Sequence, residues 1–186
     1  METPEREKSQ EQLVEEAGEI IHHNLVETGV ADMVVSKSAH AQQPFSPDFY
    51  DGIAFEYGMR TDGVFITPRL STSRNYQPVT LKLGRIAKTE TEREKISEAI
   101  WSGVDSDHRR ALIEAAIDHR IKEANGTIED SRRLPEGMDP QSAKRWARDA
   151  KGQLGVLERL KTAFADGTAE EIIDSEFASL DVKIKK

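Results

Sequence analysis

The chain has 186 residues, of which 37% are hydrophobic and 32% are charged, and its net charge is −8. No apolar run approaches the roughly 18 residues of a membrane-spanning helix, and the first residues lack the apolar core of a secretory signal. The absence of cysteine excludes disulfides, thiolate nucleophiles and cysteine-based metal sites. We therefore expect a cytoplasmic protein that makes no contact with a membrane.

The acidic charge is unevenly distributed along the chain. Residues 1–40 contain nine acidic and three basic side chains, residues 41–88 four acidic and six basic ones, and residues 89–186 twenty-one acidic and seventeen basic ones. Phosphates repel an acidic protein unless its bases gather on one face. The middle segment is the place where the sequence allows such a face.

The N-terminal segment predicts a helix near residues 4–28. Thr3 and Pro4 suit its beginning, apolar residues recur every three or four positions, and Gly29 follows its end. Residues 30–35 are too short a run to distinguish an edge strand from one more helical turn. Residues 36–51 contain two prolines and predict a loop.

Residues 52–86 are the segment that predicts a sheet. Apolar residues alternate with polar or small ones in two runs, and Thr61-Asp62-Gly63 forms a tight-turn signal between the first run and a returning strand. We predict strands near 52–60, 64–70 and 78–86 in an antiparallel meander. A sheet this small needs helices to cover its apolar face.

The remaining chain predicts four helices, near residues 90–102, 106–125, 140–165 and 169–179. Capping boxes at Thr89 and Thr168 and the Asp139-Pro140 pair suit helix starts, while Asn125-Gly126 suits a helix end. Residues 127–138 read as a linker. The apolar side of the longest helix predicts that Trp146, Leu157 and Phe164 are buried.

These elements together predict an α+β fold: an N-terminal helix, a small antiparallel β-meander and an all-α C-terminal half of about four helices. The expected organisation is an α+β module over residues 1–88 and a helical module over residues 89–186. The two modules could equally form one continuous domain.

The first helix carries the closest approach to a catalytic motif. Glu16 and Glu19 lie three residues apart, a spacing that places carboxylates on one helical face, and Asp32 follows. This arrangement resembles the paired-acid helix of the all-α nucleoside triphosphate pyrophosphohydrolases. The resemblance implies Mg²⁺ bound by Glu16, Glu19 and Asp32, and hydrolysis of nucleotides. The alternative is an acidic, solvated helix face.

Other polar patterns give weaker signals. Glu19 and His22 have the spacing of half a di-iron site, but the chain has no second Glu-x-x-His. Asp107-His108-Arg109 and Asp118-His119-Arg120 predict a ladder of local ion pairs or a charged partner-binding face. The sequence contains neither a nucleophile motif nor a glycine-rich phosphate loop.

The polar face of the predicted sheet mixes an aromatic residue with bases. If the apolar set points inward, Arg60, Phe65, Arg69 and Lys82 point outward. Such a face can bind RNA by stacking and phosphate contacts, bind a protein, or be simply solvated or covered by helices.

We interpret the chain as a non-catalytic, acidic interaction protein, either an adaptor, an inhibitor, a chaperone or an assembly component. Its expected partner is another protein with a basic surface, no cofactor is required, and a homo-oligomer is compatible with the sequence. The candidate binding residues are Glu11, Glu15, Glu16 and Glu19 of the first helix, with the polar sheet face as a second surface. The two alternatives are a Mg²⁺-dependent nucleotide pyrophosphohydrolase and a nucleic-acid-binding protein that acts through the basic sheet face.

Overall fold

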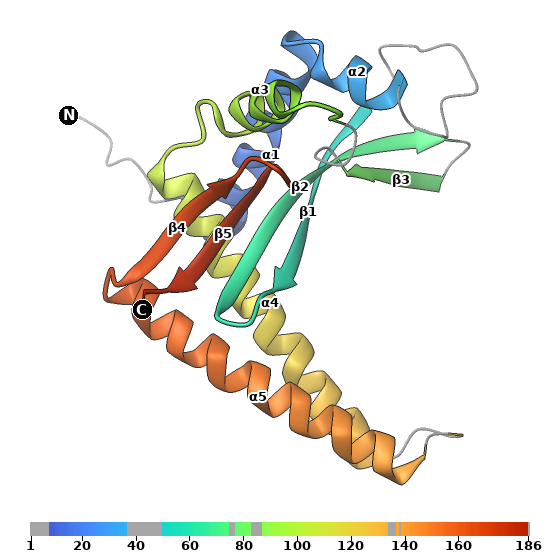
Figure 1. The fold of residues 1–186 in the computed structure, drawn as a ribbon, viewed down its shortest axis with the longest axis vertical. Coiled ribbons are helices and arrows are strands. Elements are labelled where there is room, and N and C mark those ends of the chain that lie inside the picture. Colours follow the sequence, from blue (N-terminus) through green and yellow to red (C-terminus); the bar gives the residue numbers. More distant parts are fainter. Residues whose placement is uncertain are drawn as a thin grey trace, which may run out of the picture. The chain divides into compact units, whose positions relative to one another are not determined.

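The computed structural model describes residues 8–36, 50–74, 77–82, 87–133, 137 and 139–185, with the side chains of 35–36, 50–51, 72–74 and 77–82 left out. Its helices and strands form the α+β fold that the sequence predicts (Figure 1). No helix of the described part is long and apolar enough to cross a bilayer. In chain order the elements are α1 (Gln10–Glu27), α2 (Val30–Ser36), β1 (Tyr50–Met59), β2 (Gly63–Arg74), β3 (Gln77–Lys82), α3 (Glu90–Trp101), α4 (Ser106–Arg133), α5 (Pro140–Ala165), β4 (Ala169–Asp174) and β5 (Ser179–Ile184).

The sheet contains the predicted meander and two further strands. Its strand order is β1-β2-β5-β4, and β3 pairs with β2 outside this path. Residues 69–74 of β2 pair with residues 77–82 of β3, and residues 63–66 of β2 pair with residues 180–183 of β5, both antiparallel. The backbone N–H of Arg60 donates to the carbonyl of Gly63 at 2.9 Å and closes the β1–β2 turn.

The predicted last helix, residues 169–179, is wrong. This segment forms β4 and the turn that leads into β5, so the C-terminal half has three helices and a hairpin rather than four helices. Leu180 and Val182 of β5 are buried opposite Ile66 and Val64 of β2. A short segment of this kind takes the conformation that its tertiary partner selects, because pairing with a buried strand outweighs a weak helical preference.

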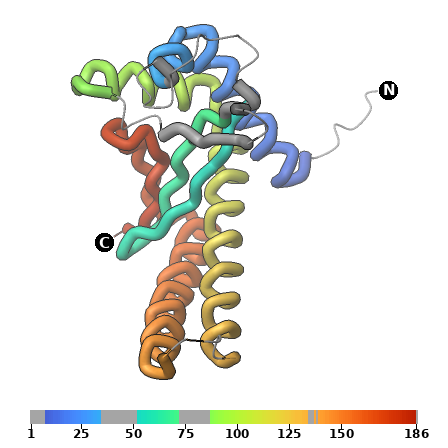
Figure 2. Tube along the Cα trace, turned by 90° about the vertical axis from the view of Figure 1, so that its right-hand side faces the viewer, coloured from blue at the N-terminus to red at the C-terminus, as the bar shows by residue number. Residues whose placement is uncertain are grey.

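Three further boundaries differ from the sequence prediction or were left open by it. Helix α1 is capped by Ser9 and begins at Gln10 rather than near residue 4. Residues 30–35 belong to helix α2, in which Val30, Ala31 and Val34 are buried. Helix α4 continues through Asn125-Gly126 to Arg133, because the buried residues Ala124 and Ile128 extend its apolar stripe. Figures 1 and 2 both show α4 and α5 side by side.

The chain divides into two compact units. Unit 1 comprises residues 1–56, 67–112 and 173–179, and unit 2 comprises residues 57–66, 113–172 and 180–186. Each unit therefore combines segments from before and after residue 88. Unit 1 contains twenty acidic and twelve basic residues, whereas unit 2 contains fourteen of each. The whole net charge of −8 thus belongs to unit 1.

Each unit has an apolar core of its own. Among the fully buried side chains of unit 1 are Ile21, Leu25, Leu70, Ile96, Ile100 and Leu112. Those of unit 2 include Val64, Ile66, Ile113, Leu157, Leu160 and Val182.

The apolar side of α5 is buried in part. Leu157 is fully buried as predicted, and Phe164 is half-buried, but Trp146 is 53% exposed and its predicted burial is wrong. Ala143 and Ala150, one turn to either side of Trp146, carry the buried contact in this part of α5. Small residues bring neighbouring helices close together, which leaves the indole at the edge of the contact.

Substitution of Gly126 tests the length of α4. Gly126 lies inside the helix, and an added Cβ would meet no atom within 4 Å, so Gly126→Ala should raise the free energy of unfolding by about 0.5–1 kcal/mol. Urea denaturation followed by far-UV circular dichroism measures this change. If the helix instead ended at this glycine in a left-handed conformation, the same substitution would destabilise the protein. Gly63→Ala is the opposite control, because its Cβ would overlap the carbonyl oxygen of Val182.

A pair of substitutions in α5 tests the pattern of burial. Leu157→Ala removes a fully buried side chain and should lower the free energy of unfolding by about 2–5 kcal/mol. Trp146→Ala removes a side chain that is half in solvent and should cost less than about 1 kcal/mol. Equal losses in the same denaturation experiment would contradict the exposure of Trp146.

Candidate functional site

A groove of about 390 Å³ lies in unit 1, along one side of α1. Helix α1 and strand β1 both contribute to its walls. The lining residues are Val14, Glu15, Gly18, Glu19 and His22 from α1, and Gly52, Ile53 and Phe55 from β1.

The local sequence of α1 builds this groove. The lining positions recur every three or four residues, so they share one side of the helix. Gly18 has no side chain and is buried, and a Cβ placed on it would lie 3.7 Å from Cε2 of Phe55 and 3.9 Å from Cβ of Ile53. A larger residue at this position would therefore push against β1 and fill the groove.

Helix α1 is held firmly on its other sides. Ala17, Ile21 and Leu25 are fully buried, and the helix contacts α2 and α3. Its N-terminus is closed by a capping box between Ser9 and Gln12. These contacts fix the orientation of the side chains that line the groove.

The groove combines carboxylates with an apolar wall. Glu15 and Glu19 are exposed, whereas Ile53 and Phe55 are partly buried. His22 contributes an imidazole whose Nε2 is buried and has no hydrogen-bond partner in the described part of the chain. The groove can therefore receive a cationic group next to an apolar one.

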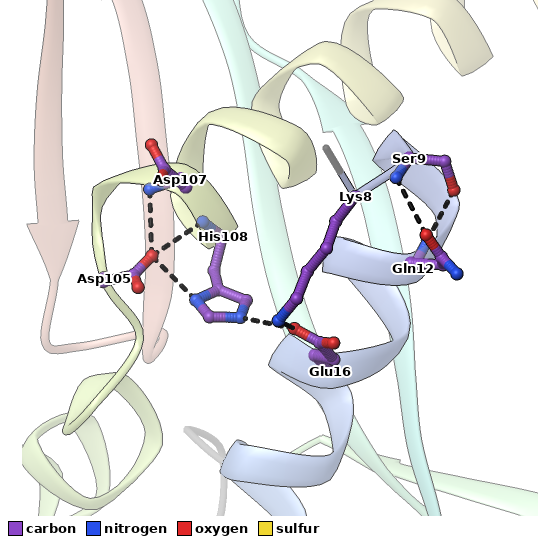
Figure 3. A network of polar contacts seen from close by, with 7 residues as sticks. All are labelled: Lys8, Ser9, Gln12, Glu16, Asp105, Asp107 and His108. Carbon is purple, nitrogen blue, oxygen red and sulfur yellow. Dashed lines mark hydrogen bonds and ion pairs between the residues drawn. The ribbon is translucent and has the colours of Figure 1, made fainter. Parts of the chain in front are cut away.

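Glu16 belongs to a different arrangement, a polar network that joins α1 to the start of α4 (Figure 3). The Glu16 carboxylate accepts a hydrogen bond from Lys8 Nζ at 2.7 Å and lies 3.4 Å from Nε2 of the buried His108. Asp105 caps α4 by accepting from the backbone amides of Asp107 and His108, at 2.9 and 3.0 Å, and it lies 2.7 Å from His108 Nδ1. The imidazole thus bridges two carboxylates.

Both carboxylates of this network have lowered pKa values. The hydrogen bond from Lys8 is the main cause that lowers the pKa of Glu16, and the contact with His108 adds to it. The backbone amide of His108 is the main cause of the lowered pKa of Asp105. Glu16 therefore has a structural environment that Glu15 and Glu19 do not share.

The structure separates the acids that the sequence grouped together. Glu15 and Glu19 line the groove, Glu16 joins the polar network, Glu11 is exposed on α1 outside the groove, and Asp32 is exposed on α2. Among the residues that the structure describes, no three His, Asp or Glu side chains form a group that could hold a metal ion. Glu16, Glu19 and Asp32 are thus not assembled into a metal site.

The two arginines of the expected basic sheet face both have carboxylate partners. In unit 2, Arg60 Nε donates to Asp181 at 2.7 Å, and its guanidinium lies 4.8 Å from the centre of the Phe65 ring. In unit 1, Arg69 Nε donates to Glu56 at 2.9 Å. The side chain of Lys82 lies outside the described residues. The charges of Arg60 and Arg69 are therefore largely neutralised by carboxylates of this chain.

Sequence reasoning missed part of the groove. None of Gly18, Gly52, Ile53 and Phe55 is among the candidate residues that the sequence suggests, and His22 is considered there only as a metal ligand. The available signal was the glycine in the middle of an otherwise good helix, which often marks a close approach of another backbone.

Comparison with family models, curated proteins and solved structures found no match to this chain. The function must therefore be argued from the site itself.

The polar network predicts how stability depends on pH. Glu16 and Asp105 have folded-state pKa values below their ordinary values of 4.5 and 3.8. Their ionised forms therefore contribute to the free energy of unfolding above the ordinary values. This contribution is lost as the pH falls through the lowered folded-state pKa values. Urea denaturation at several pH values between about 6 and 3 should show this loss. Asp105→Asn keeps a side chain that caps helices equally well and removes the charge, so it should flatten the pH dependence in this window. An unchanged pH profile in Asp105→Asn would contradict the assignment.

Proposed function

We propose that this protein is a non-catalytic interaction module that binds a short basic segment of a protein partner in the groove between α1 and β1. The observation that carries the proposal is the pairing of two exposed carboxylates, Glu15 and Glu19, with the apolar wall of Ile53 and Phe55. The partner segment would place an arginine or lysine at the carboxylates and an apolar side chain on the wall.

Charge supports a basic partner. Unit 1 carries twenty acidic and twelve basic residues, and Glu11, Glu15 and Glu19 are all exposed on its first helix. Exposed charges of one sign accelerate the encounter with an oppositely charged partner and make it sensitive to salt. Glu15 and Glu19 then act at short range as acceptors for the bound cation.

The size of the groove supports a short segment as the ligand. A volume of about 390 Å³ is at the lower end of the range for small-ligand sites, roughly 300–1,000 Å³. It can hold a few side chains of an extended or helical segment. Apolar burial against Phe55 would supply affinity that exposed ion pairs alone do not supply.

The two alternative functions lack comparable support. Metal-dependent hydrolysis of nucleotides would need the acids of α1 and α2 together, and the described residues hold no such group. Binding of nucleic acid through the sheet would need free bases, but Arg60 and Arg69 are engaged by Asp181 and Glu56.

Binding of a model peptide tests the proposal. We expect a labelled peptide of about twelve residues, in which arginine alternates with leucine, to bind the wild-type protein in a fluorescence anisotropy titration. The double substitution Glu15→Gln with Glu19→Gln should weaken binding by about tenfold, equivalent to about 1.4 kcal/mol. Phe55→Ala keeps the charge of the groove and should also weaken binding.

A matched control separates the groove from the general charge of α1. Glu11→Gln with Glu27→Gln removes two exposed charges of the same helix outside the groove and should change the affinity by less than about twofold. Equal losses in the two double variants would show that only net charge matters and would refute the groove as the binding site. Circular dichroism confirms that each variant is folded.

A further inference from the structure

A stripe of basic side chains follows the solvent face of α5. Lys144, Arg148, Lys151 and Arg159 are separated by four, three and eight residues, which places them on one side of the helix, and all four are exposed. The buried residues Ala143, Ala150 and Leu157 occupy the other side. At 1.5 Å per residue the stripe is about 22 Å long. We call these four residues the α5 stripe.

The charges of the α5 stripe are available to a ligand. Within the described part of the chain, no ion pair joins Lys144, Lys151 or Arg159 to a carboxylate. Arg148 lies 3.6 Å from Asp149, which Arg145 also approaches at 4.0 Å, and the Arg148 side chain is 79% exposed. Lys144, Lys151 and Arg159 therefore differ from the sheet arginines Arg60 and Arg69, which both have carboxylate partners.

The surrounding unit does not oppose an anionic ligand by its overall charge. Unit 2, which contains the stripe, has fourteen acidic and fourteen basic residues, and the excess of acids belongs to unit 1. The net charge of unit 2 is therefore zero, and an anion that approaches the α5 stripe is not repelled by a net negative charge of this unit. We propose that the α5 stripe binds the phosphate backbone of double-stranded nucleic acid without reading its sequence.

The composition of the stripe favours nucleic acid over an acidic protein segment or a membrane. It contains no apolar side chain, and Gly155, between Lys151 and Arg159, has open space where a Cβ would be. Protein segments and membrane surfaces gain affinity from buried apolar area, whereas a duplex gains it from counterion release. The exposed Trp146 is about 160° around the helix from Lys144 and Arg148, so it does not join the stripe.

The dimensions of the stripe give a quantitative expectation. One strand of a duplex presents a charge every 3.4 Å or so, so a stripe of about 22 Å faces about six phosphates. Four bases can neutralise up to four of them. The logarithm of the binding constant should then fall with the logarithm of salt concentration with a slope of about −3 to −4.

Anisotropy titrations with a labelled duplex DNA of mixed sequence, from about 50 mM to about 200 mM salt, test the proposal. The wild-type protein should bind with the expected slope. Arg148→Gln with Lys151→Gln should reduce the size of the slope by about 2 and weaken binding more than tenfold at the lowest salt concentration. The control, Lys122→Gln with Lys161→Gln, removes two bases of unit 2 outside the stripe and should leave the slope unchanged.

Several outcomes would overturn the proposal. The first is the absence of duplex binding at about 50 mM salt. The second is an equal loss of duplex affinity in the two double variants. The third is binding of polyglutamate or anionic phospholipid vesicles as tightly as the duplex. The last result would show an acidic protein segment or a membrane as the partner. Glu15→Gln with Glu19→Gln should not weaken duplex binding, so a failure here is distinguishable from a failure of the groove.

Discussion

The pairing of β2 with β5 is the contact on which the C-terminal part of the fold depends. Val64 and Ile66 lie opposite Val182 and Leu180, and all four side chains are buried. The strands meet closely, since no side chain fits at Gly63, next to the carbonyl of Val182. More than a hundred residues separate the two strands in the sequence. The β4–β5 hairpin forms because β5 pairs with this buried strand.

Helix α1 presents different sides to the core of unit 1, to a polar network and to the groove. Its buried side packs in unit 1, Glu16 joins the network of Lys8, His108 and Asp105, and Glu15 and Glu19 line the groove. Three acids within five residues thus have two different roles. The difference arises because a helix rotates each successive side chain by about 100°, so neighbours in sequence face different surroundings.

The two binding proposals rest on an uneven distribution of charge. Arg60 is paired with Asp181 of β5, and Arg69 of β2 is paired with Glu56 of β1. Among the described residues, Lys144, Lys151 and Arg159 of the α5 stripe form no ion pair, and only Arg148 lies near a carboxylate, that of Asp149. Acidic unit 1 and the α5 stripe of unit 2 therefore suit partners of opposite sign.

The sequence by itself determined the α+β class, the meander and the ends of several helices. Thr89 caps α3 by accepting from the amide of Glu92, and Asp139 caps α5 by accepting from the amide of Ser142, as their local patterns predict. These two caps formed as predicted because they are hydrogen bonds between near neighbours, whereas the capping box predicted at Thr168 was wrong because the following segment pairs as β4. The tertiary structure alone decided the β4–β5 hairpin, the exposure of Trp146 and the shape of the groove. Each of these three features depends on contacts with a segment that is distant in the sequence. A local sequence pattern does not identify that segment.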